Sequence, residues 1–254
     1  MGHFLLRPRW LIGLALVIAV AVSFALLGMW QLERLDRRRA YERLVAQRLA
    51  SPPVTLSEAL VSNGGDLRYR RVVAEGSFDP RHEVILYGRT QAGLTGNHVL
   101  TPLVLDDGTA VAVDRGWIPL AQDDPPVVEA APPPGRVRVT GVLFPPEAGG
   151  DTLGASATGR EPVTTLTRVD LTAVAAQVPY PLAPAYLLLA SQDPPQRGLP
   201  EVAPLPDAAD APPHLSYAIQ WFTFATIGVV GFAVLVRREY GRTLEAETGS
   251  PADA

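Results

Sequence analysis

The chain has 254 residues, 47% of them hydrophobic, a formal net charge of −4 and no cysteine. The absence of cysteine excludes disulfides, thiolate metal sites and cysteine nucleophiles, and the small net charge argues against a nucleic-acid partner. The apolar excess is concentrated in residues 10–29 and 215–236, which carry no charge and are long enough to cross a hydrocarbon layer about 30 Å thick.

The first predicted membrane-spanning helix covers residues 10–30, after a short polar segment at 1–9. A cleaved signal peptide is the alternative, because Ala19-Val20-Ala21 has the small-x-small form of a cleavage site. The apolar sequence continues to Trp30, beyond the usual length of a signal core, which favours an uncleaved anchor. Small residues four apart also predict a face for close helix packing, made of Ala15, Ala19 and Ser23.

Residues 31–192 are predicted to form one domain that begins with a polar helix over 31–50 and is β-rich beyond Pro52 and Pro53. Asp106-Asp107-Gly108 is a hairpin turn signal, and Asp170 is the predicted N-cap of a short helix over 171–177. Val- and Leu-rich runs bounded by Gly, Pro and Asp predict strands at 70–78, 83–89, 98–105, 109–117, 136–144 and 186–190. Short strands at this spacing favour a small antiparallel barrel or sandwich.

The proline-rich segment 193–213 is predicted to be a semi-rigid tether into the second span, 214–236, which a polar tail at 237–254 follows. The charges around the two spans favour opposite orientations. Five arginines between positions 34 and 43 would keep the domain cytoplasmic, whereas Arg237 and Arg238 after the second span favour the reverse. Charge alone therefore leaves the orientation open.

Motifs for catalysis are absent: there is no phosphate-binding glycine loop, no Gly-x-Ser-x-Gly elbow and no His-Glu-x-x-His helix. The stretch from Asp114 to Trp117 ends a predicted strand. We interpret it as a buried Asp114–Arg115 pair that fixes a turn, with Gly116 in a special backbone conformation. The alternative is a polar site at the rim of the sheet. A coupled Asp114–His98 pair with strongly shifted titration, placed in a cleft, would favour an enzyme.

The start of the second span places polar and aromatic residues on one helical stripe: His214, Tyr217, Trp221, Phe224 and Gly228. Because both spans end on the domain side, Arg34 is expected at the same membrane level. A neutral imidazole is an axial ligand for haem iron, aromatic rings can pack the macrocycle, and an arginine can pair with a propionate. The same residues also fit an interfacial aromatic belt without chemistry, or a surface for helix–helix or partner contacts.

Four stretches occur in a fixed order along the chain. They are Gly28-Met-Trp-Gln-Leu-Glu-Arg34, then Tyr69-Arg-Arg-Val72 with Gly76-Ser-Phe78, then Leu100-Thr-Pro-Leu103 with Val113-Asp-Arg-Gly-Trp-Ile-Pro119, and finally His214-Leu-Ser-Tyr-Ala-Ile-Gln-Trp221. Over about residues 10–240 the chain thereby resembles the Surfeit locus protein 1 family of cytochrome c oxidase assembly factors. The proline-rich segments at 123–134 and 193–213 are not part of the family pattern.

The resemblance implies an α+β membrane protein in which two transmembrane helices flank an antiparallel β-rich extracytoplasmic domain, with both termini on the cytoplasmic side of the plasma membrane. It implies a non-enzymatic assembly factor for haem–copper cytochrome c oxidase that aids delivery of haem a to the largest oxidase subunit. Haem a synthase is a further expected partner. The resemblance assigns the haem iron to His214, and position adds Tyr217, Trp221 and Arg34 as cofactor-binding residues. The alternative is a membrane scaffold that stabilises an oxidase intermediate without binding haem.

Overall fold

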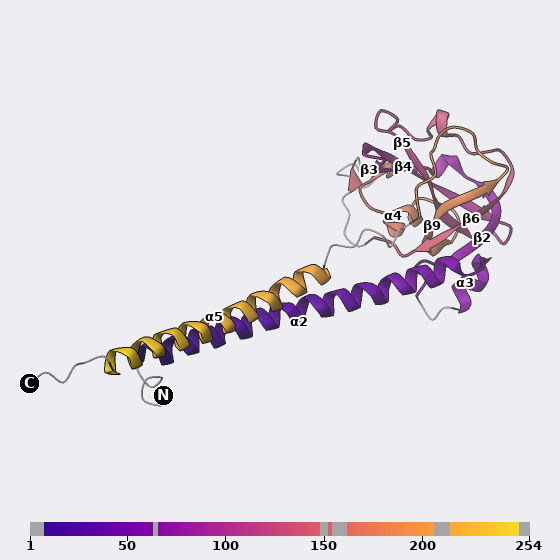
Figure 1. Ribbon diagram of the computed structural model, residues 1–254. Coiled ribbons are helices and arrows are strands. Elements are labelled where there is room, and N and C mark those ends of the chain that lie inside the picture. Colours follow the sequence, from indigo (N-terminus) through magenta and orange to yellow (C-terminus); the bar gives the residue numbers. More distant parts are fainter. Residues whose placement is uncertain (1–7, 63–65, 148–151, 154–161, 206–213, 249–254) are drawn as a thin grey trace, which may run out of the picture. The chain divides into compact units, whose positions relative to one another are not determined.

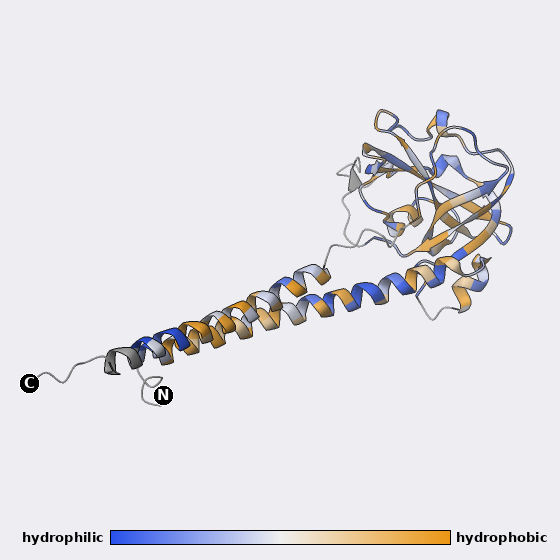
Figure 2. Ribbon diagram, viewed as in Figure 1, coloured by the Kyte–Doolittle hydropathy of each residue, from blue (hydrophilic) through white to orange (hydrophobic). Residues whose placement is uncertain are grey.

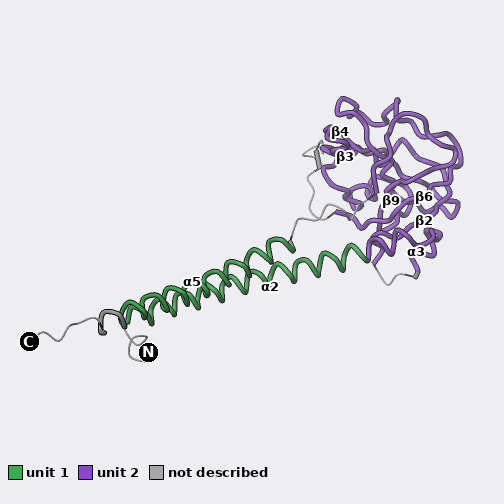
Figure 3. The backbone as a smooth tube through the Cα atoms, viewed as in Figure 1, with its two compact units in different colours: residues 1–43, 208–254 green, residues 44–207 purple. Residues whose placement is uncertain are grey.

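The computed structural model describes residues 8–62, 66–147, 152–153, 162–205 and 214–248, which belong to two compact units. One unit comprises residues 1–43 and 208–254, and the other comprises residues 44–207 (Figure 3). Two long helices, α2 (Pro8–Ala50) and α5 (His214–Thr248), account for the described part of the first unit, and the last turns of α2 enter the second (Figure 1). The second unit is the β-rich domain.

Helix α2 is continuous from the apolar span through the polar segment, as predicted for residues 31–50. Its described part starts at Pro8, and the helix ends before Pro52 and Pro53, which cannot continue a helix. Both α2 and α5 have apolar stretches long enough to cross a membrane (Figure 2), and almost none of these stretches is buried inside the protein. By length and composition both helices are therefore candidate membrane spans.

The β-rich unit confirms the six predicted strands, with ends shifted by a few residues. Sequence patterns missed the seven-residue helix α3 and the elements of two or three residues, which are too short to show a period. In chain order the elements after α2 are β1 (Val54–Thr55), α3 (Leu56–Ser62), β2 (Arg71–Phe78), η1 (Pro80–His82), β3 (Val84–Gln91), β4 (Leu94–Leu105), β5 (Ala110–Pro119), η2 (Val128–Ala130), β6 (Arg136–Phe144), β7 (Thr152–Leu153), β8 (Thr165–Leu166), α4 (Leu171–Ala175) and β9 (Leu182–Asp193).

The described strands form one sheet in the order β1-β2-β6-β9-β5-β4-β3-β8-β7. Strand β2 also pairs with β4, so that β2, β6, β9, β5 and β4 form a closed ring of pairings. The predicted antiparallel sheet is wrong in three places, because β1–β2, β3–β8 and β5–β9 are parallel. Parallel neighbours need a crossover connection. Helix α3 lies in the connection from β1 to β2, and α4 lies in the approach to β9.

The alternation of buried and exposed residues, together with local hydrogen bonds in turns and caps, explains how the sheet forms its core. Strand β2 buries alternate residues, among them Val72 and Ala74, whereas β5 is buried along almost its whole length. The predicted hairpin turn is present: the Leu105 N–H donates to the Thr109 carbonyl at 2.8 Å, and Gly108 has φ of +79°. Asp170 caps α4, accepting hydrogen bonds from the N–H groups of Thr172 and Ala173.

The predicted proline-rich tether begins within the β-rich unit. Strand β9 continues to Asp193, and residues 201 and 117 form an antiparallel bridge in which the Trp117 N–H donates to the Glu201 carbonyl at 2.7 Å. Pro200 and Ala203 are buried. The chain through residue 203 therefore packs on the domain, and the rest of the predicted tether, 206–213, lies outside the described residues.

Candidate functional site

Aromatic side chains join α2 to α5 within the first unit. The Phe24 ring lies 5.4 Å from the Trp221 ring and 6.0 Å from the Phe224 ring, and the Trp10 ring lies 6.1 Å from the Phe232 ring. Because the positions on α2 rise while those on α5 fall, the two helices are antiparallel neighbours.

Two glycines of α2 make room for the phenylalanines of α5. A Cβ added to Gly28 would lie 2.7 Å from the Phe222 ring, and one added to Gly13 would lie 3.1 Å from the Phe232 ring. Ala218 of α5 is almost completely buried. Glycine and alanine therefore let the two backbones approach closely, with aromatic rings filling the space between them.

The predicted stripe of aromatic residues is divided by this helix contact. Trp221 is half-buried against Phe24, and Phe224 also contacts Phe24, so both rings take part in helix packing. Tyr217 is 48% exposed, and Gly228 has open space around it. His214 begins α5, but its side chain lies outside the described residues.

Arg34 lies at the level of the first turns of α5. Gly28 is opposite Phe222, and each helix advances about 1.5 Å per residue. Six residues farther along α2, Arg34 is therefore opposite about residue 216. Its guanidinium lies 5.5 Å from the centre of the Trp30 ring of its own helix, and Arg34 and Trp30 are both exposed. The packing of the two helices therefore places Arg34 and Tyr217 at about the same height along the helix pair, as predicted.

The small-residue face predicted for close packing does not contact α5. Ala15, Ala19 and Ser23 are exposed, and the Ser23 hydroxyl donates to the Ala19 carbonyl at 2.8 Å. The contact face is instead offset around α2 and includes Gly13, Phe24 and Gly28. Spacing alone identified a set of small residues but not the side of the helix that is covered.

The predicted Asp114–Arg115 pair is wrong, because neighbouring residues of a strand point to opposite faces. Arg115 has no exposed surface, and its Nη1 donates to the Glu83 carboxylate at 3.4 Å. Glu83 also accepts from the Thr101 hydroxyl at 3.0 Å and from the Val127 N–H at 2.8 Å. Burial raises the pKa of Glu83 and lowers the pKa of Arg115 to about 10, while three donors favour the carboxylate form.

Asp114 pairs with His98 of β4, whose Nδ1 lies 2.9 Å from the carboxylate, and both residues are largely buried. The Asp114 carboxylate also accepts from the Gly116 N–H at 3.2 Å. Gly116 has φ of +124°, which confirms its predicted special conformation, and an added Cβ would lie 2.1 Å from the Glu201 carbonyl oxygen. These contacts fix the end of β5 against β4 and the returning chain, which is a structural role.

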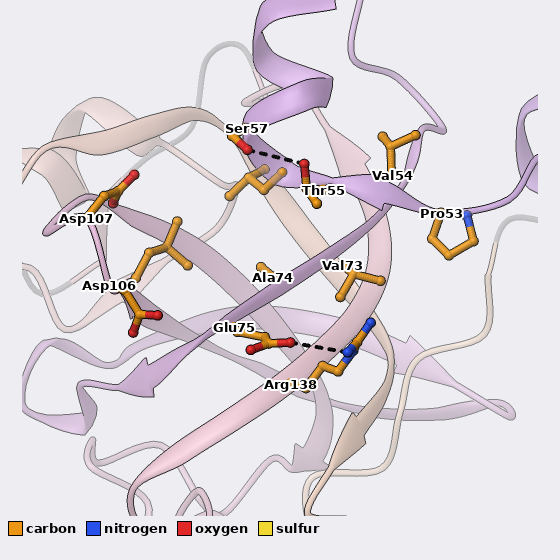
Figure 4. Close-up of a pocket in the computed structure, with 12 residues that line it drawn as sticks. Pro53, Val54, Thr55, Ser57, Val73, Ala74, Glu75, Asp106, Asp107 and Arg138 are labelled. Carbon is orange, nitrogen blue, oxygen red and sulfur yellow. Dashed lines mark hydrogen bonds and ion pairs between the residues drawn. The ribbon is translucent and has the colours of Figure 1, made fainter.

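A cavity of about 460 Å³ in the β-rich unit opens beside β2, between β1 and the β4–β5 turn (Figure 4). Val54 and Val73 form part of its apolar wall, and Glu75 and Arg138, which face each other on β2 and β6, form an ion pair of 3.2 Å along the wall. No histidine and no aromatic ring line this cavity. Its walls therefore lack the groups that would hold haem. Within the ranges that the structure describes, no three His, Asp or Glu side chains are grouped so that they could hold a metal ion.

Comparison with known proteins gives a consistent family assignment. The model of the SURF1 family matches residues 18–226. An uncharacterized SURF1-like protein of Mycobacterium tuberculosis is 31% identical over 98% of this chain and 91% of its own length. A SURF1-like protein of Rickettsia bellii is 27% identical over 91% of this chain and 94% of its own length. The cytochrome oxidase assembly protein SHY1 of Saccharomyces cerevisiae is 30% identical over 41% of this chain and 28% of its own length.

Proposed function

The chain belongs to the SURF1 family, and we propose that it is a membrane-anchored, non-enzymatic factor for the assembly of cytochrome oxidase. The observation that carries this proposal is the family match, which starts within α2, covers the β-rich unit and ends within α5. Similarity to a yeast protein named for cytochrome oxidase assembly supports the process. The oxidase complex is then the partner, with the largest subunit and haem a synthase as the expected contacts.

The proposed location is the plasma membrane, with α2 and α5 as its two spans. Their exposed apolar surfaces support this assignment, since lipid tails would cover them. We place both termini on the cytoplasmic side and the β-rich unit outside, as the family resemblance implies. In that orientation the arginines at 34–43 lie on the extracytoplasmic side, although the charge rule would place them on the cytoplasmic side.

The proposed cargo is haem a, which would bind at the start of α5. His214 would supply a neutral imidazole to the iron, the exposed Tyr217 ring would cover part of the macrocycle, and Arg34 would pair with a propionate. Trp221 is already packed against Phe24, so it would form the floor of the site rather than close over the cofactor. A factor that passes haem on must also release it, and a single ligand at an open helix end suits release better than a buried pair.

His214→Ala tests the haem proposal. The full chain, purified from membranes that produce haem a, is expected to show a haem absorbance spectrum that the variant loses, with at least a tenfold drop in haem content. Gln220→Ala is the matched control, because Gln220 is an exposed polar residue of the same helix. A variant with an unchanged spectrum and haem content would eliminate His214 as the ligand.

A scaffold without haem is the second candidate function. The observation that favours it is the packing of Trp221 and Phe224 against Phe24, which uses two of the predicted aromatic residues for helix contact. A scaffold predicts that oxidase subunits co-purify with the chain while no haem does. Co-purification is therefore measured on the same samples as the spectrum, because it separates failure of haem binding from failure of the assembly role.

A further inference from the structure

The exposed apolar surface of α2 gives way to a run of charged residues directly after Trp30 and Leu32. These two side chains are 46% and 37% exposed. Residues 33–43 contain five arginines and three carboxylates, which gives the segment a net charge of +2. The whole segment belongs to the same unit as the apolar part of α2.

Two of the five arginines are neutralised within the helix. Arg37 pairs with Glu33 at 3.4 Å, and Arg38 pairs with Glu42 at 2.8 Å, each one helical turn away. The other three, Arg34, Arg39 and Arg43, are exposed and have no carboxylate within ion-pair distance among the residues that the structure describes. Arg34 is instead held over the Trp30 ring. The unpaired positive charge therefore points to an anionic partner outside this chain.

The spacing along the helix decides which guanidinium groups can reach a membrane surface. A tryptophan at the end of an apolar span lies at the level of the headgroups, which form a layer roughly 5–8 Å thick on each side. Arg34 lies about 6 Å beyond Trp30 along the helix axis, Arg39 about 13 Å and Arg43 about 20 Å. Long side chains of a helix point back toward its N-terminus, here toward the apolar span, so Arg39 can still reach the headgroups.

We propose that Arg39, together with Arg34 while no haem propionate occupies it, binds the phosphate groups of anionic phospholipids where α2 leaves the membrane. This inference rests on the proposal that α2 is a membrane span. A guanidinium matches a phosphate with two parallel hydrogen bonds, and the Trp30 ring restricts Arg34 before any lipid arrives. A lipid partner is favoured over a protein because the charged segment continues directly from the lipid-facing apolar surface. The contact explains how a positive segment is held at the extracytoplasmic surface, although the charge rule favours the cytoplasmic side.

The test measures headgroup preference of the full chain in vesicles of phosphatidylcholine and phosphatidylglycerol at a ratio of 4:1. Spin-labelled versions of each lipid report the fraction immobilised by the protein. Wild type is expected to immobilise phosphatidylglycerol in preference to phosphatidylcholine. An arginine near an anionic surface contributes about 1 kcal/mol, or about fivefold, so Arg39→Gln should lower that preference by about two- to fivefold. Arg34→Gln should act in the same direction.

Arg43→Gln is the matched control: it removes the same charge from the same exposed helix, but beyond the headgroups, and should leave the preference unchanged. Equal immobilisation of both lipids by wild type, or equal losses in the Arg39 and Arg43 variants, would overturn the inference. Selective displacement by inorganic phosphate at constant ionic strength would also overturn it, in favour of a free-phosphate site. Extraction of the chain from vesicles by alkaline carbonate would refute the membrane anchor as well, whereas lost preference in an inserted chain refutes only the lipid contact.

Discussion

Replacing Arg115 with methionine should destabilise the β-rich unit by about 3–5 kcal/mol, because the change leaves the Glu83 carboxylate buried without its counter-charge. Arg115 has no exposed surface and connects four parts of the fold. It donates to Glu83 beside β3, to the Ala130 carbonyl in η2 and to the Gln196 side chain, and its guanidinium lies 5.3 Å from the Phe78 ring of β2. For a domain of this size the loss corresponds to a fall in Tm of roughly 10 °C.

The double variant Arg115→Met, Glu83→Leu separates charge burial from lost packing. When both ionised groups are removed, no uncompensated charge remains, and we expect about half or more of the lost stability to return. The stability of both variants is measured by heating the detergent-solubilised chain and using proteolysis of the β-rich unit to report its unfolding. If the double variant is as unstable as the sum of its single changes, the ion pair does not explain the role of Arg115.

The sequence predicted the strands well because their apolar runs are long, and it predicted the caps and turns because Asp170 and Gly108 act through local hydrogen bonds. It could not predict the partners of buried charges. Glu83 and Arg115 are separated by 32 residues and meet only through strand pairing. The error at Asp114 has a specific cause. Asp114 and Arg115 are neighbours in the sequence, but the pleat of β5 directs Asp114 toward His98 and Arg115 toward Glu83.

The helix pair likewise combines features that each segment predicts by itself with a contact that depends on both segments. Length and hydropathy identify both apolar helices, but the side of α2 that α5 covers depends on which rings fit which gaps. Judged by residue size alone, Ala15, Ala19 and Ser23 favour close helix packing as much as Gly13 and Gly28 do. The difference is that Phe222 and Phe232 of α5 fill the spaces over the two glycines. The sequence of one helix alone does not show which of its faces fits against the other helix.

Gly28→Leu should separate α2 from α5 and reduce oxidase assembly. A Cβ at this position would lie within 2.7–2.9 Å of three atoms of the Phe222 ring, so that a leucine displaces this ring from its place between the helices and we expect the helices to move apart. Overpacking of this kind costs about 1–3 kcal/mol, enough to reduce the paired population about five- to a hundredfold. The chain has no native cysteine, so cysteines introduced at Ala21 and Ala225, which are both partly buried in the helix pair, report pairing through the yield of a bismaleimide cross-link.

Two further variants determine whether the helix contact itself matters. Gly231→Leu places the same side chain on α5 where an added Cβ meets nothing within 4 Å, so cross-linking and oxidase content should stay at the wild-type level. Gly28→Leu combined with Phe222→Ala removes the clashing ring and should restore much of both signals. Recovery of the cross-link without recovery of oxidase would show that Phe222 has a role beyond packing. Normal oxidase content in Gly28→Leu cells, despite a lost cross-link, would show that assembly does not depend on the helix pair.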